Sequence, residues 1–555
     1  MAQAPELVFL PLGGVGEIGM NLALYGFGQR DRRSWLAVDF GVAFAHADLP
    51  GVDLILPDID FLEKRRASLA GIVITHAHED HLGALIDLWP RLRVPVYATA
   101  FAANLLAAKV AGEPGAAAVP ITLVTPGERV AIGPFEVEYI NVAHSIPESN
   151  ALAIRTALGT VVHSADWKLD DTPTVGAPTD EARLRAIGEE GVLALVCDST
   201  NALREGRSPS EAEVGRELAD IISTARRRVA FTAFASNVGR IRSIALATGA
   251  AGRNLVVVGR AMRRIIDVSQ ELGLLEGAPP FLGEDAYPEL PPDKVVALLS
   301  GSQGEPRAAL ARVAVGSHPR VELAAGDIVV FSARAIPGNE LDINRIVNAL
   351  TARRIRVLTD RDRLVHVSGH PRRDELREIY RWLKPKIAIP VHGEAMHLAA
   401  HADLARELAV PAVLTIADGD MVRLAPDPVE QIDEIAAGRL YKDGLIVGGI
   451  DAVGVTERRR LSFAGHVGVS VVIDRRGDLL ADPQVSPFGL PAGDGGGRPL
   501  METIMDAVVD AIESLPRPRR KDAEAVREAV RRAVRAAVAG VWGKKPVCTV
   551  VVTVV

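Results

Sequence analysis

One short segment, THAHEDHLG, restricts the possible folds of this 555-residue chain more than any other feature. It carries His76, His78, Asp80 and His81 directly after the apolar run GIVI, so three of the chain's 13 histidines stand at the end of one predicted strand. In an extended segment the two histidines of H-x-H lie on the same side, while the D-H pair, one turn later, can face a second ion. Imidazole and carboxylate are ligands that Zn²⁺ accepts. A solvated polar loop is the alternative, but the pattern favours a site for two metal ions.

Further ligand candidates occur later in the chain, each at the end of an apolar run. They are His144 in INVAHS, Asp166 in HSADWK and His392 in IPVHGE. Alone, each would more often be a capping or surface residue, but the ends of successive strands meet at one edge of a sheet, so we expect these side chains to converge. Asp39, in VDFG at another strand end, is expected to orient a ligand histidine. The predicted sets are His76, His78 and His144 for one ion, Asp80, His81 and His392 for the other, and Asp166 as the bridge.

The order of predicted elements indicates an α/β chain in which one compact unit is interrupted by an inserted domain. Short apolar runs over 6–60 predict a strand meander, and SPSEAEVGRELADIISTA (208–225) predicts a helix capped by Ser208 or Ser210. From there to about 350, strands alternate with helical segments, which indicates an insertion with a parallel sheet. RLVHVSGHP (363–371) and KIAIPVHGE (386–394) then repeat the strand-then-histidine pattern of the first region.

The domain boundaries predicted from this order are as follows. The interrupted unit covers 1–207 and 351–430, and the insertion covers 208–350. A linker over 431–462 leads to a small C-terminal α/β domain, 463–555, with helices at 501–514 and 521–539 and a terminal strand.

The hexapeptide GVGEIG (14–19) matches the dinucleotide fingerprint G-x-G-x-x-G, but its context excludes that function. A dinucleotide-binding turn opens a helix. Here the following NLALYGFG has the pattern of a strand. We therefore predict a tight hairpin and reject NAD as a cofactor.

Composition narrows the class of protein further. The net charge of −7 argues mildly against a protein that coats nucleic acid, but it does not exclude a nuclease, which needs positive potential only along its substrate channel. Two cysteines, Cys197 and Cys548, are too few for a disulfide framework or a cysteine zinc site. The sequence has no apolar stretch of about 18 residues, and its N-terminus lacks the basic stretch of a signal peptide. We expect a cytoplasmic protein without a membrane span.

The spacing H-x-H-x-D-H, followed by isolated His, Asp and His, resembles the metallo-β-lactamase superfamily. Three more motifs are similar to motifs A, B and C of the β-CASP nucleases, namely DST with Asp198, SGH with His370 and PVHGE with His392. Over roughly residues 7–450, GGVGEIGMN, HSIPES, FASN, GSQGEP and HVSGH resemble the bacterial ribonuclease J family. One local difference is Pro-Arg-Arg at 371–373, where smaller residues are common in the family.

The resemblance implies a metallo-β-lactamase αββα sandwich with an inserted β-CASP domain and a small C-terminal domain. It implies a zinc-dependent ribonuclease with two Zn²⁺ per subunit, 5′→3′ exonuclease and endonuclease activity, and a preference for 5′-monophosphate ends. The implied partners are single-stranded RNA, further copies of the chain in a homodimer or homotetramer, and an RNA-decay assembly. The implied catalytic residues are Asp80, His81, Asp198 and His370, with His370 as the general acid.

The segment HVSGH alternates imidazole and hydroxyl around a glycine, which lets the backbone approach a ligand closely. A protonated histidine, a hydroxyl and free N–H groups together suit a phosphate oxygen, whereas a structural turn is the alternative. The resemblance implies a 5′-monophosphate pocket formed by His366, Val367, Ser368, Gly369 and His370, joined by Ser332 from VVFSAR.

Two aspartates far apart in the sequence resemble positions that bind calcium in some relatives. They are Asp48 in the HADLPGVD loop and Asp443 in YKDG. Carboxylates on loops suit a hard cation, but we favour ordinary surface aspartates, so one Ca²⁺ stays an open alternative.

Two other functions stay open at this point. A small-molecule hydrolase, lactamase-like or thioesterase-like, would use the same metal core, but such enzymes do not need the long insertion at 208–350. A non-enzymatic RNA-binding scaffold would arise from the loss of metal ligands, but all seven expected ligands are present.

Overall fold

The structure, a computed structural model, describes residues 4–46, 48–336, 338–493 and 497–555. The chain forms two compact units, one of Met1–Ala43 with Leu56–Arg439 and one of Phe44–Ile55 with Leu440–Val555. Among the described residues, no helix is long and apolar enough to cross a membrane.

An antiparallel meander opens the first unit, but it ends at Val38, and the strands in the rest of the predicted range 6–60 belong to another sheet. β1 (Glu6–Gly13) pairs with β3 (Leu22–Gly28), and β3 pairs with β4 (Ser34–Val38). A hairpin at GVGEIG is confirmed, because β1 and β3 pair across it and no helix follows, but the connection spans residues 14–21 and is wider than the tight turn predicted. Within that turn β2 (Val15–Gly16) pairs in parallel with β22 (Gly393–Glu394), which links the turn to the strand end that carries His392.

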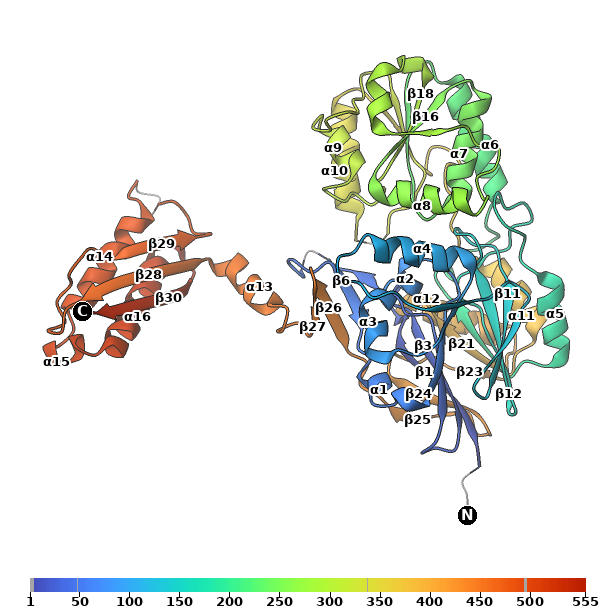
Figure 1. The fold of residues 1–555 in the computed structure, drawn as a ribbon, viewed down its shortest axis with the longest axis horizontal. Coiled ribbons are helices and arrows are strands. Elements are labelled where there is room, and N and C mark those ends of the chain that lie inside the picture. Colours follow the sequence, from blue (N-terminus) through green and yellow to red (C-terminus); the bar gives the residue numbers. More distant parts are fainter. Residues whose placement is uncertain (1–3, 47, 337, 494–496) are drawn as a thin grey trace. The chain divides into compact units, whose positions relative to one another are not determined.

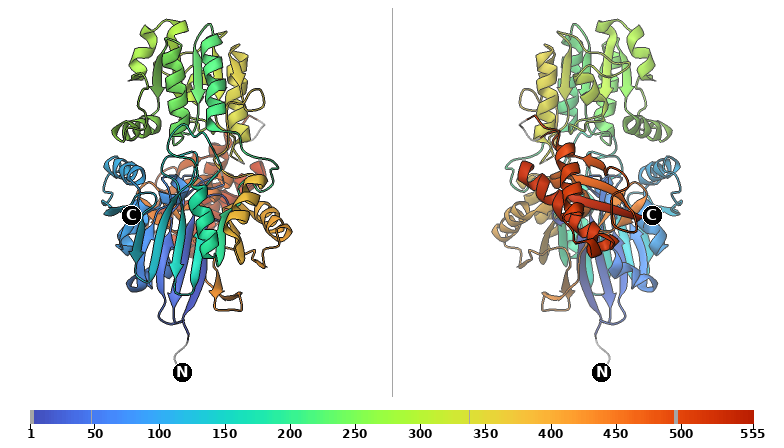
Figure 2. Two further views of the ribbon diagram at one scale, coloured as in Figure 1. Left: turned by 90° about the vertical axis from the view of Figure 1, so that its right-hand side faces the viewer. Right: turned by 90° about the vertical axis from the view of Figure 1, so that its left-hand side faces the viewer.

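Two mixed sheets form a sandwich in the first unit (Figures 1 and 2). The first has the order β25-β24-β1-β3-β4-β7-β8-β9 and the second the order β10-β11-β12-β13-β14-β21-β23. Their inner faces share one core, in which Phe9 and Tyr25 of the first sheet and Val137 and Leu152 of the second are fully buried. The further bounds in the first sheet are β7 (Leu69–Val73), β8 (Val96–Ala98), β9 (Ile121–Leu123), β24 (Asp420–Ala425) and β25 (Glu430–Glu434). Those in the second are β10 (Arg129–Ile132), β11 (Phe135–Asn141), β12 (Asn150–Thr156), β13 (Gly159–His163), β14 (Ala194–Asp198), β21 (Ile387–Val391) and β23 (Ala412–Val413).

Helices cover the outer faces of both sheets, which gives the αββα layers that the resemblance implies. On the second sheet, Leu184, Leu376 and Leu404 anchor three helices and are fully buried. On the first, Trp35 of β4 meets Phe61 of α1 with ring centroids 5.1 Å apart. The helices of this sandwich are α1 (Asp60–Glu63), α2 (Glu79–Leu82), α3 (Leu85–Leu92), α4 (Ala100–Ala111), α5 (Glu181–Glu190), α11 (Arg373–Leu383) and α12 (Ala395–Glu407).

The insertion is a parallel sheet with helices on both faces, as the sequence predicts (Figure 1). Its strand order is β17-β16-β18-β15-β19-β20, and every pair is parallel. The predicted helix over 208–225 is confirmed as α6 (Glu211–Thr224), where Ser210 and Glu213 form a capping box. The strands are β15 (Val229–Thr232), β16 (Asn254–Val258), β17 (Phe281–Leu282), β18 (Val295–Leu299), β19 (Ile328–Phe331) and β20 (Arg356–Leu358). The other helices are α7 (Val238–Ala250), α8 (Arg260–Glu271), α9 (Ala309–Ala314) and α10 (Glu340–Ala352).

Some segments differ from the sequence prediction. The insertion runs past its predicted end at 350, because β20 at Arg356–Leu358 pairs with β19 in its sheet. RLVHVSGHP (363–371), predicted as a strand, pairs with no strand among the described residues. Its carbonyls bond to side chains instead, as Val365 O does with Arg240 and His370 O with Asn201. The expected linker over 431–462 contains regular structure, namely most of β25, β26 (Arg439–Asp443), β27 (Ile446–Gly448) and α13 (Val455–Ala464).

The second unit brings together segments that are distant in the sequence. β26 and β27 belong to a sheet of order β27-β26-β6-β5 with β6 (Leu54–Pro57) and β5 (Ala43–Phe44), so the early loop 44–55 pairs with chain near residue 440. The predicted C-terminal helices are confirmed as α14 (Leu500–Glu513) and α16 (Ala523–Trp542), which pack on a sheet of order β29-β28-β30. The remaining bounds are α15 (Arg517–Arg520), β28 (His466–Ile473), β29 (Gln484–Phe488) and β30 (Val547–Val554).

Candidate metal centre and phosphate pocket

The predicted metal ligands converge at strand ends along one edge of the sandwich. Each of them is buried or half-buried. The set is His76 and His78 in the loop after β7, Asp80 and His81 in α2, His144 after β11, Asp166 after β13 and His392 after β21. The sequence folds this way because each ligand follows an apolar strand that is held in the shared core.

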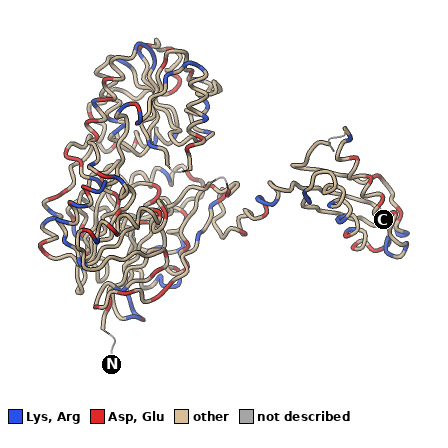
Figure 3. The backbone as a smooth tube through the Cα atoms, turned by 180° about the vertical axis from the view of Figure 1, so that it is seen from behind, with Lys and Arg blue, Asp and Glu red and all other residues tan. Residues whose placement is uncertain are grey.

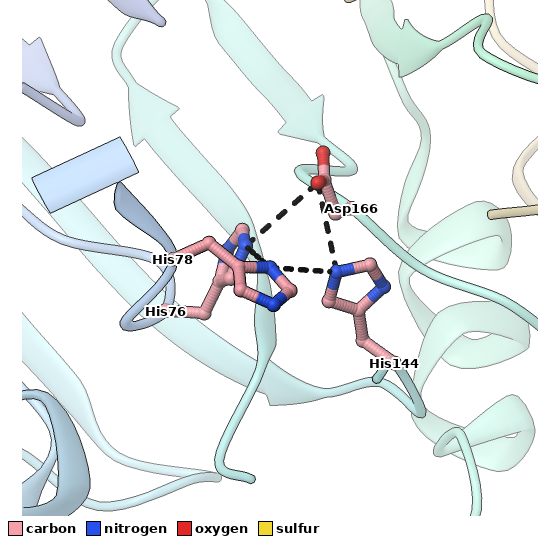
Figure 4. Close-up of side chains that lie close together, drawn as sticks. All are labelled: His76, His78, His144 and Asp166. Carbon is pink, nitrogen blue, oxygen red and sulfur yellow. Dashed lines mark hydrogen bonds and ion pairs between the residues drawn. The ribbon is translucent and has the colours of Figure 1, made fainter. Parts of the chain in front are cut away.

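Four of these side chains form a first group that could hold a metal ion. His76, His78, His144 and Asp166 have ligand atoms within 4.8 Å of one another. Figure 4 shows the three imidazoles and the carboxylate gathered around a common space. His78 Nδ1 lies 3.1 Å from His76 Nε2 and 3.0 Å from His144 Nε2. Asp166 Oδ2 lies 3.7 Å and 3.6 Å from the same two Nε2 atoms.

A second group shares Asp166 and adds Asp80, His81 and His392, again within 4.8 Å. Asp166 Oδ2 lies 3.3 Å from His81 Nε2, and Asp166 Oδ1 lies 3.5 Å from His392 Nε2. Asp80 Oδ2 lies 3.6 Å from His81 Nε2 and 3.8 Å from His392 Nε2. The structure thus brings together both ligand sets that the sequence predicts, with Asp166 between them.

The residues of both groups fit zinc as a metal. Asp166 Oδ1 and His392 Nε2 are buried and have no hydrogen-bond partner among the described residues. Buried polar atoms without partners are costly, and a cation would satisfy both atoms at once. Every candidate ligand atom is an imidazole nitrogen or a carboxylate oxygen, which are atoms that Zn²⁺ accepts.

Neighbouring side chains hold the ligand imidazoles in place. Asp39 Oδ2 accepts a hydrogen bond from His81 Nδ1 at 2.7 Å, and Asp39 Oδ1 accepts one from the Thr75 N–H at 2.8 Å. This geometry agrees with the orienting role expected of Asp39. Asn21 Oδ1 accepts a hydrogen bond from His392 Nδ1 at 2.9 Å. Asp39 and His392 themselves adopt left-handed φ values of 63° and 51°, which are uncommon outside glycine and concentrate at functional sites.

The electrostatic surroundings favour the metal-binding forms of several of these groups, but not of His81. Burial, followed by the charge of His81, holds the pKa of His76 well below its usual value, and burial followed by His78 does the same for the pKa of His144. Burial lowers the pKa of His78 to about 4. These imidazoles are therefore neutral at pH 7, as ligands must be. Burial raises the pKa of Asp166, but His392 and His81 outweigh it and hold that pKa well below its usual range. Burial lowers the pKa of His81, but the carboxylates of Asp166 and then Asp80 outweigh burial and hold that pKa well above its usual value.

Asp198 and His370 form a pair beside the metal ligands. Asp198 ends β14, and its Oδ2 accepts a hydrogen bond from His370 Nδ1 at 2.7 Å. Burial lowers the pKa of His370, but Asp198 and then Asp166 outweigh burial and raise the pKa to about 9. A protonated imidazole held through Nδ1 keeps a second proton on Nε2, which it can donate.

The HVSGH loop (366–370) contacts the metal centre directly. Gly369 O accepts a hydrogen bond from His144 Nδ1 at 2.7 Å, which leaves His144 Nε2 for a metal ion. A Cβ at residue 369 would lie 2.6 Å from His144 Nδ1, so this approach requires glycine. In the same loop, Ser368 Oγ accepts a hydrogen bond from Asn201 Nδ2 at 2.9 Å, and its O–H can donate to a ligand. His366 Nδ1 is buried and has no partner among the described residues.

Two residues of the predicted phosphate pocket do not offer a ligand the direct side-chain contact that the sequence analysis expects. Ser332 Oγ donates to Val365 O at 2.7 Å and accepts from Arg240 Nη1 at 2.5 Å, so its hydroxyl is already engaged inside the protein. Burial imposes this, because a buried hydroxyl needs partners. Val367 is also buried, at 4% exposure, and offers a ligand only its backbone.

Sequence reasoning missed four residues that support the site. Asn21 and Asn201 anchor His392 and Ser368 as described above, and Ser236 Oγ lies 3.1 Å from His78 Nε2. Arg240 holds Ser332 and Val365. For Arg240 the sequence did carry a signal, because this charged residue lies among the apolar residues Val238, Ile241 and Ile244 on the buried side of α7.

Charged residues of both signs are interspersed along the chain in both units (Figure 3). The surroundings of His366 are different. Burial first, and then the positive charges of Arg240, Arg334 and Lys168, hold the pKa of His366 well below its usual value. Two of these cations are themselves paired with buried carboxylates, Arg240 with Glu211 and Lys168 with Asp170.

The two aspartates considered for calcium are engaged otherwise. Asp443 forms an ion pair with Arg458, and Asp48 Oδ2 lies 3.0 Å from Arg459 Nη2. Neither aspartate belongs to a candidate metal-holding group among the described residues. This agrees with the surface role that the sequence analysis favours.

The fold and the site together define a metal-dependent hydrolase of the metallo-β-lactamase superfamily that carries a β-CASP domain. Four family models match the chain: Beta-lactamase superfamily domain at 50–240, Ribonuclease J beta-CASP domain at 226–350, Zn-dependent metallo-hydrolase RNA specificity domain at 354–414 and Ribonuclease J C-terminal domain at 453–555. The chain belongs to the ribonuclease J family.

Individual proteins agree with this assignment. A ribonuclease J of Sinorhizobium meliloti is 58% identical over 553 residues, which cover 100% of this chain and 98% of the relative. A ribonuclease J of Mycolicibacterium smegmatis is 39% identical over 478 residues, covering 85% of this chain and 84% of the relative. A solved structure of a protein of unknown function from Enterococcus faecalis shares the fold, with a TM-score of 0.52 and 15% identity over 75% of this chain and 100% of that one.

Proposed function

We propose that this chain is a zinc-dependent ribonuclease with 5′→3′ exonuclease and endonuclease activity, which favours 5′-monophosphate ends and acts in RNA maturation and decay. The observation that carries this proposal is the 2.7 Å hydrogen bond between His144 Nδ1 and Gly369 O, since it joins a metal-ligand histidine to the phosphate-binding HVSGH loop. The family membership and the donor-rich loop support RNA as the substrate.

Two sets of side chains would hold two zinc ions. When bound, the ions supply Lewis-acid catalysis of phosphodiester hydrolysis. His76, His78 and His144 would bind one ion, Asp80, His81 and His392 the other, and Asp166 both. The role of Asp39 and Asn21 is to fix the ring orientation of His81 and His392 through their second nitrogens.

His370 would act as the general acid. Its Nδ1 is held by Asp198, and its Nε2 proton is available to the leaving 3′-oxygen. Addition of water to phosphorus and protonation of that oxygen give products with a 5′-phosphate and a 3′-hydroxyl. The Asp198 carboxylate stabilises the protonated imidazole before the transfer.

The HVSGH loop would select the 5′ end of the substrate. His366 and Ser368 offer donors to one terminal phosphate, and Ser332 supports the loop from behind. An RNA whose end lies in this loop would be degraded exonucleolytically, whereas an RNA threaded past it would be cut internally. Calcium is not part of this proposal, because Asp48 and Asp443 are each paired with an arginine.

We further propose that the chain works in the cytoplasm as a homodimer or homotetramer on single-stranded RNA and within an RNA-decay assembly. The strand β30 supports self-association, because it lies at the edge of its sheet and exposes Val551 and Val554. An apolar sheet edge left bare invites pairing with another strand.

A small-molecule hydrolase is the alternative that the metal site alone would allow. The test compares hydrolysis of 5′-phosphorylated RNA, nitrocefin and a thioester, each with and without a chelator. We expect the protein to cleave the RNA but neither nitrocefin nor the thioester, and we expect the chelator to stop the RNA cleavage. Hydrolysis of nitrocefin or the thioester without RNA cleavage would contradict the proposal, and RNA binding without any cleavage would favour a scaffold.

A further inference from the structure

Arg240 of α7 is fully buried, and all three of its guanidinium nitrogens donate hydrogen bonds. Nε and Nη2 bond to the two carboxylate oxygens of Glu211 at 2.9 Å and 3.0 Å. Nη1 bonds to Ser332 O at 3.0 Å and to Val365 O at 2.9 Å. One side chain therefore joins the start of α6, the end of β19 and the residue that precedes the HVSGH loop.

A series of buried groups leads from Glu211 to the metal ligands. The Glu211 N–H donates to Asp170 Oδ2 at 2.9 Å, and the same oxygen lies 2.7 Å from Lys168 Nζ. Lys168 and Asp170 are 2% and 3% exposed. Lys168 comes two residues after Asp166, and its N–H donates to the carbonyl of Ala143, beside His144, at 2.8 Å. Arg240 is thus connected to the segments that carry two metal ligands.

The HVSGH loop is anchored on both sides, by Arg240 on one and by the metal-ligand candidate His144 on the other. Val365 O, just before the loop, bonds to Arg240, and Gly369 O, near its end, bonds to His144. His366 and Ser368 lie between these two anchors. Hydrogen bonds at both ends of the loop would therefore hold a bound phosphate at a defined distance from the metal ligands.

We propose that Arg240 is a positioning residue that sets the distance between the 5′-phosphate loop and the metal centre, and so selects which phosphodiester bond is cut when a 5′ end is bound. This inference rests on the proposed function above. Internal cleavage does not need a 5′ end in the loop, so it depends little on Arg240. Lysine is no substitute, because a single ammonium group lacks the planar fork that serves Glu211 and two carbonyls together.

The test uses the full-length, zinc-loaded protein and two RNAs of the same sequence. One RNA is linear with a radioactive 5′-monophosphate, and the other is circular and has no end. We expect the wild type to release a 5′ product of one length from the linear RNA. Arg240→Lys should spread the cuts over neighbouring bonds and raise KM for the linear RNA about tenfold, with kcat less affected. Cleavage of the circular RNA and the zinc content should stay at wild-type values.

Two further variants complete the design. Arg242→Lys is the matched control, because Arg242 lies on the same helix but bonds to Thr174 O at 3.2 Å outside the site. Glu211→Gln keeps the side-chain shape and weakens the bond to Arg240, so it tests the same idea if Arg240→Lys does not fold. A folded Arg240→Lys or Glu211→Gln variant that cuts at the wild-type bond with the wild-type KM overturns the inference. Equal loss of linear and circular cleavage also overturns it. A wild-type protein that cleaves neither RNA overturns the proposed function and this inference with it.

Discussion

Two sets of strand ends face each other in the first unit, and they differ in chemistry. The strands β11, β13 and β21 of the sandwich lead into His144, Asp166 and His392. The last two have buried atoms with no hydrogen-bond partner in the described part of the chain. The strands β15 and β19 of the insertion lead toward Ser236 and Ser332, whose hydroxyls are engaged with protein groups. The edge of the sandwich thus offers ligand atoms to cations, whereas the hydroxyls at the edge of the insertion hold neighbouring protein groups in place. Under the proposed function, chemistry takes place at the first edge, and the HVSGH loop between the two edges selects the substrate end.

The largest effect should come from the metal edge. We expect Asp80→Ala and His81→Ala to reduce RNA cleavage by at least about 1,000-fold, since loss of a ligand to a catalytic metal removes ~4 kcal/mol or more of transition-state stabilisation. Cleavage rates, zinc content and thermal unfolding are the measurements. Asp403→Ala, on the exposed side of α12, is the control. Near-normal turnover in a folded Asp80→Ala variant would rule out the two-metal site.

The contact between the loop and the metal edge should be next in size. Gly369→Ala places a Cβ 2.6 Å from His144 Nδ1, so the imidazole or the loop must shift. Misplacement by about 1 Å costs on the order of 100-fold in rate, which is the loss we expect in both linear and circular RNA cleavage. Gly283→Ala, where a Cβ meets nothing within 4 Å, should be silent. Unchanged zinc affinity and rates in Gly369→Ala would show that this contact is not needed.

The loop itself should control selection rather than chemistry. Two extra phosphoryl groups at a triphosphate end would be unpaired and partly desolvated, and a ~3 kcal/mol penalty corresponds to a preference for monophosphate on the order of 100-fold. Ser368→Ala removes one donor and should reduce exonuclease activity on monophosphate RNA about tenfold. The assay measures degradation of one RNA that carries either a 5′-monophosphate or a 5′-triphosphate, together with cleavage of the circular form of the same RNA. Equal wild-type rates on both ends would contradict the assigned pocket, and circular RNA should be cut equally well by wild type and variant.

The smallest effect on catalysis should come from the C-terminal part. Removal of residues 455–555, starting where α13 begins, should lower the oligomer mass measured by light scattering. Zinc content and internal RNA cleavage should persist, because all candidate metal-holding groups among the described residues lie in the first unit. A truncated protein that keeps the oligomeric state of the full chain would contradict the role proposed for β30.

Much of the fold follows from local sequence patterns. The apolar runs predict the strands, the pair Ser210 and Glu213 marks the start of α6, and the strand after GVGEIG excludes a dinucleotide site. The ligand types of the metal centre are equally visible, because each ends an apolar run. These features depend on neighbours within a few residues, so a single sequence contains the information for them.

Other features depend on where distant segments meet, and only the tertiary structure decided them. Asn21 and His392 are 371 residues apart, yet they share a hydrogen bond. The loop 44–55 joins strands near residue 440, and the segment 363–371 is anchored by side chains instead of pairing as a strand. Ser332 has a hydroxyl suited to phosphate, but burial against Arg240 engages it inside the protein. The sequence determined which chemical groups this chain possesses. The tertiary structure determined which of these groups remain available to metal and substrate, because three-dimensional packing sets the hydrogen-bond partners of buried groups.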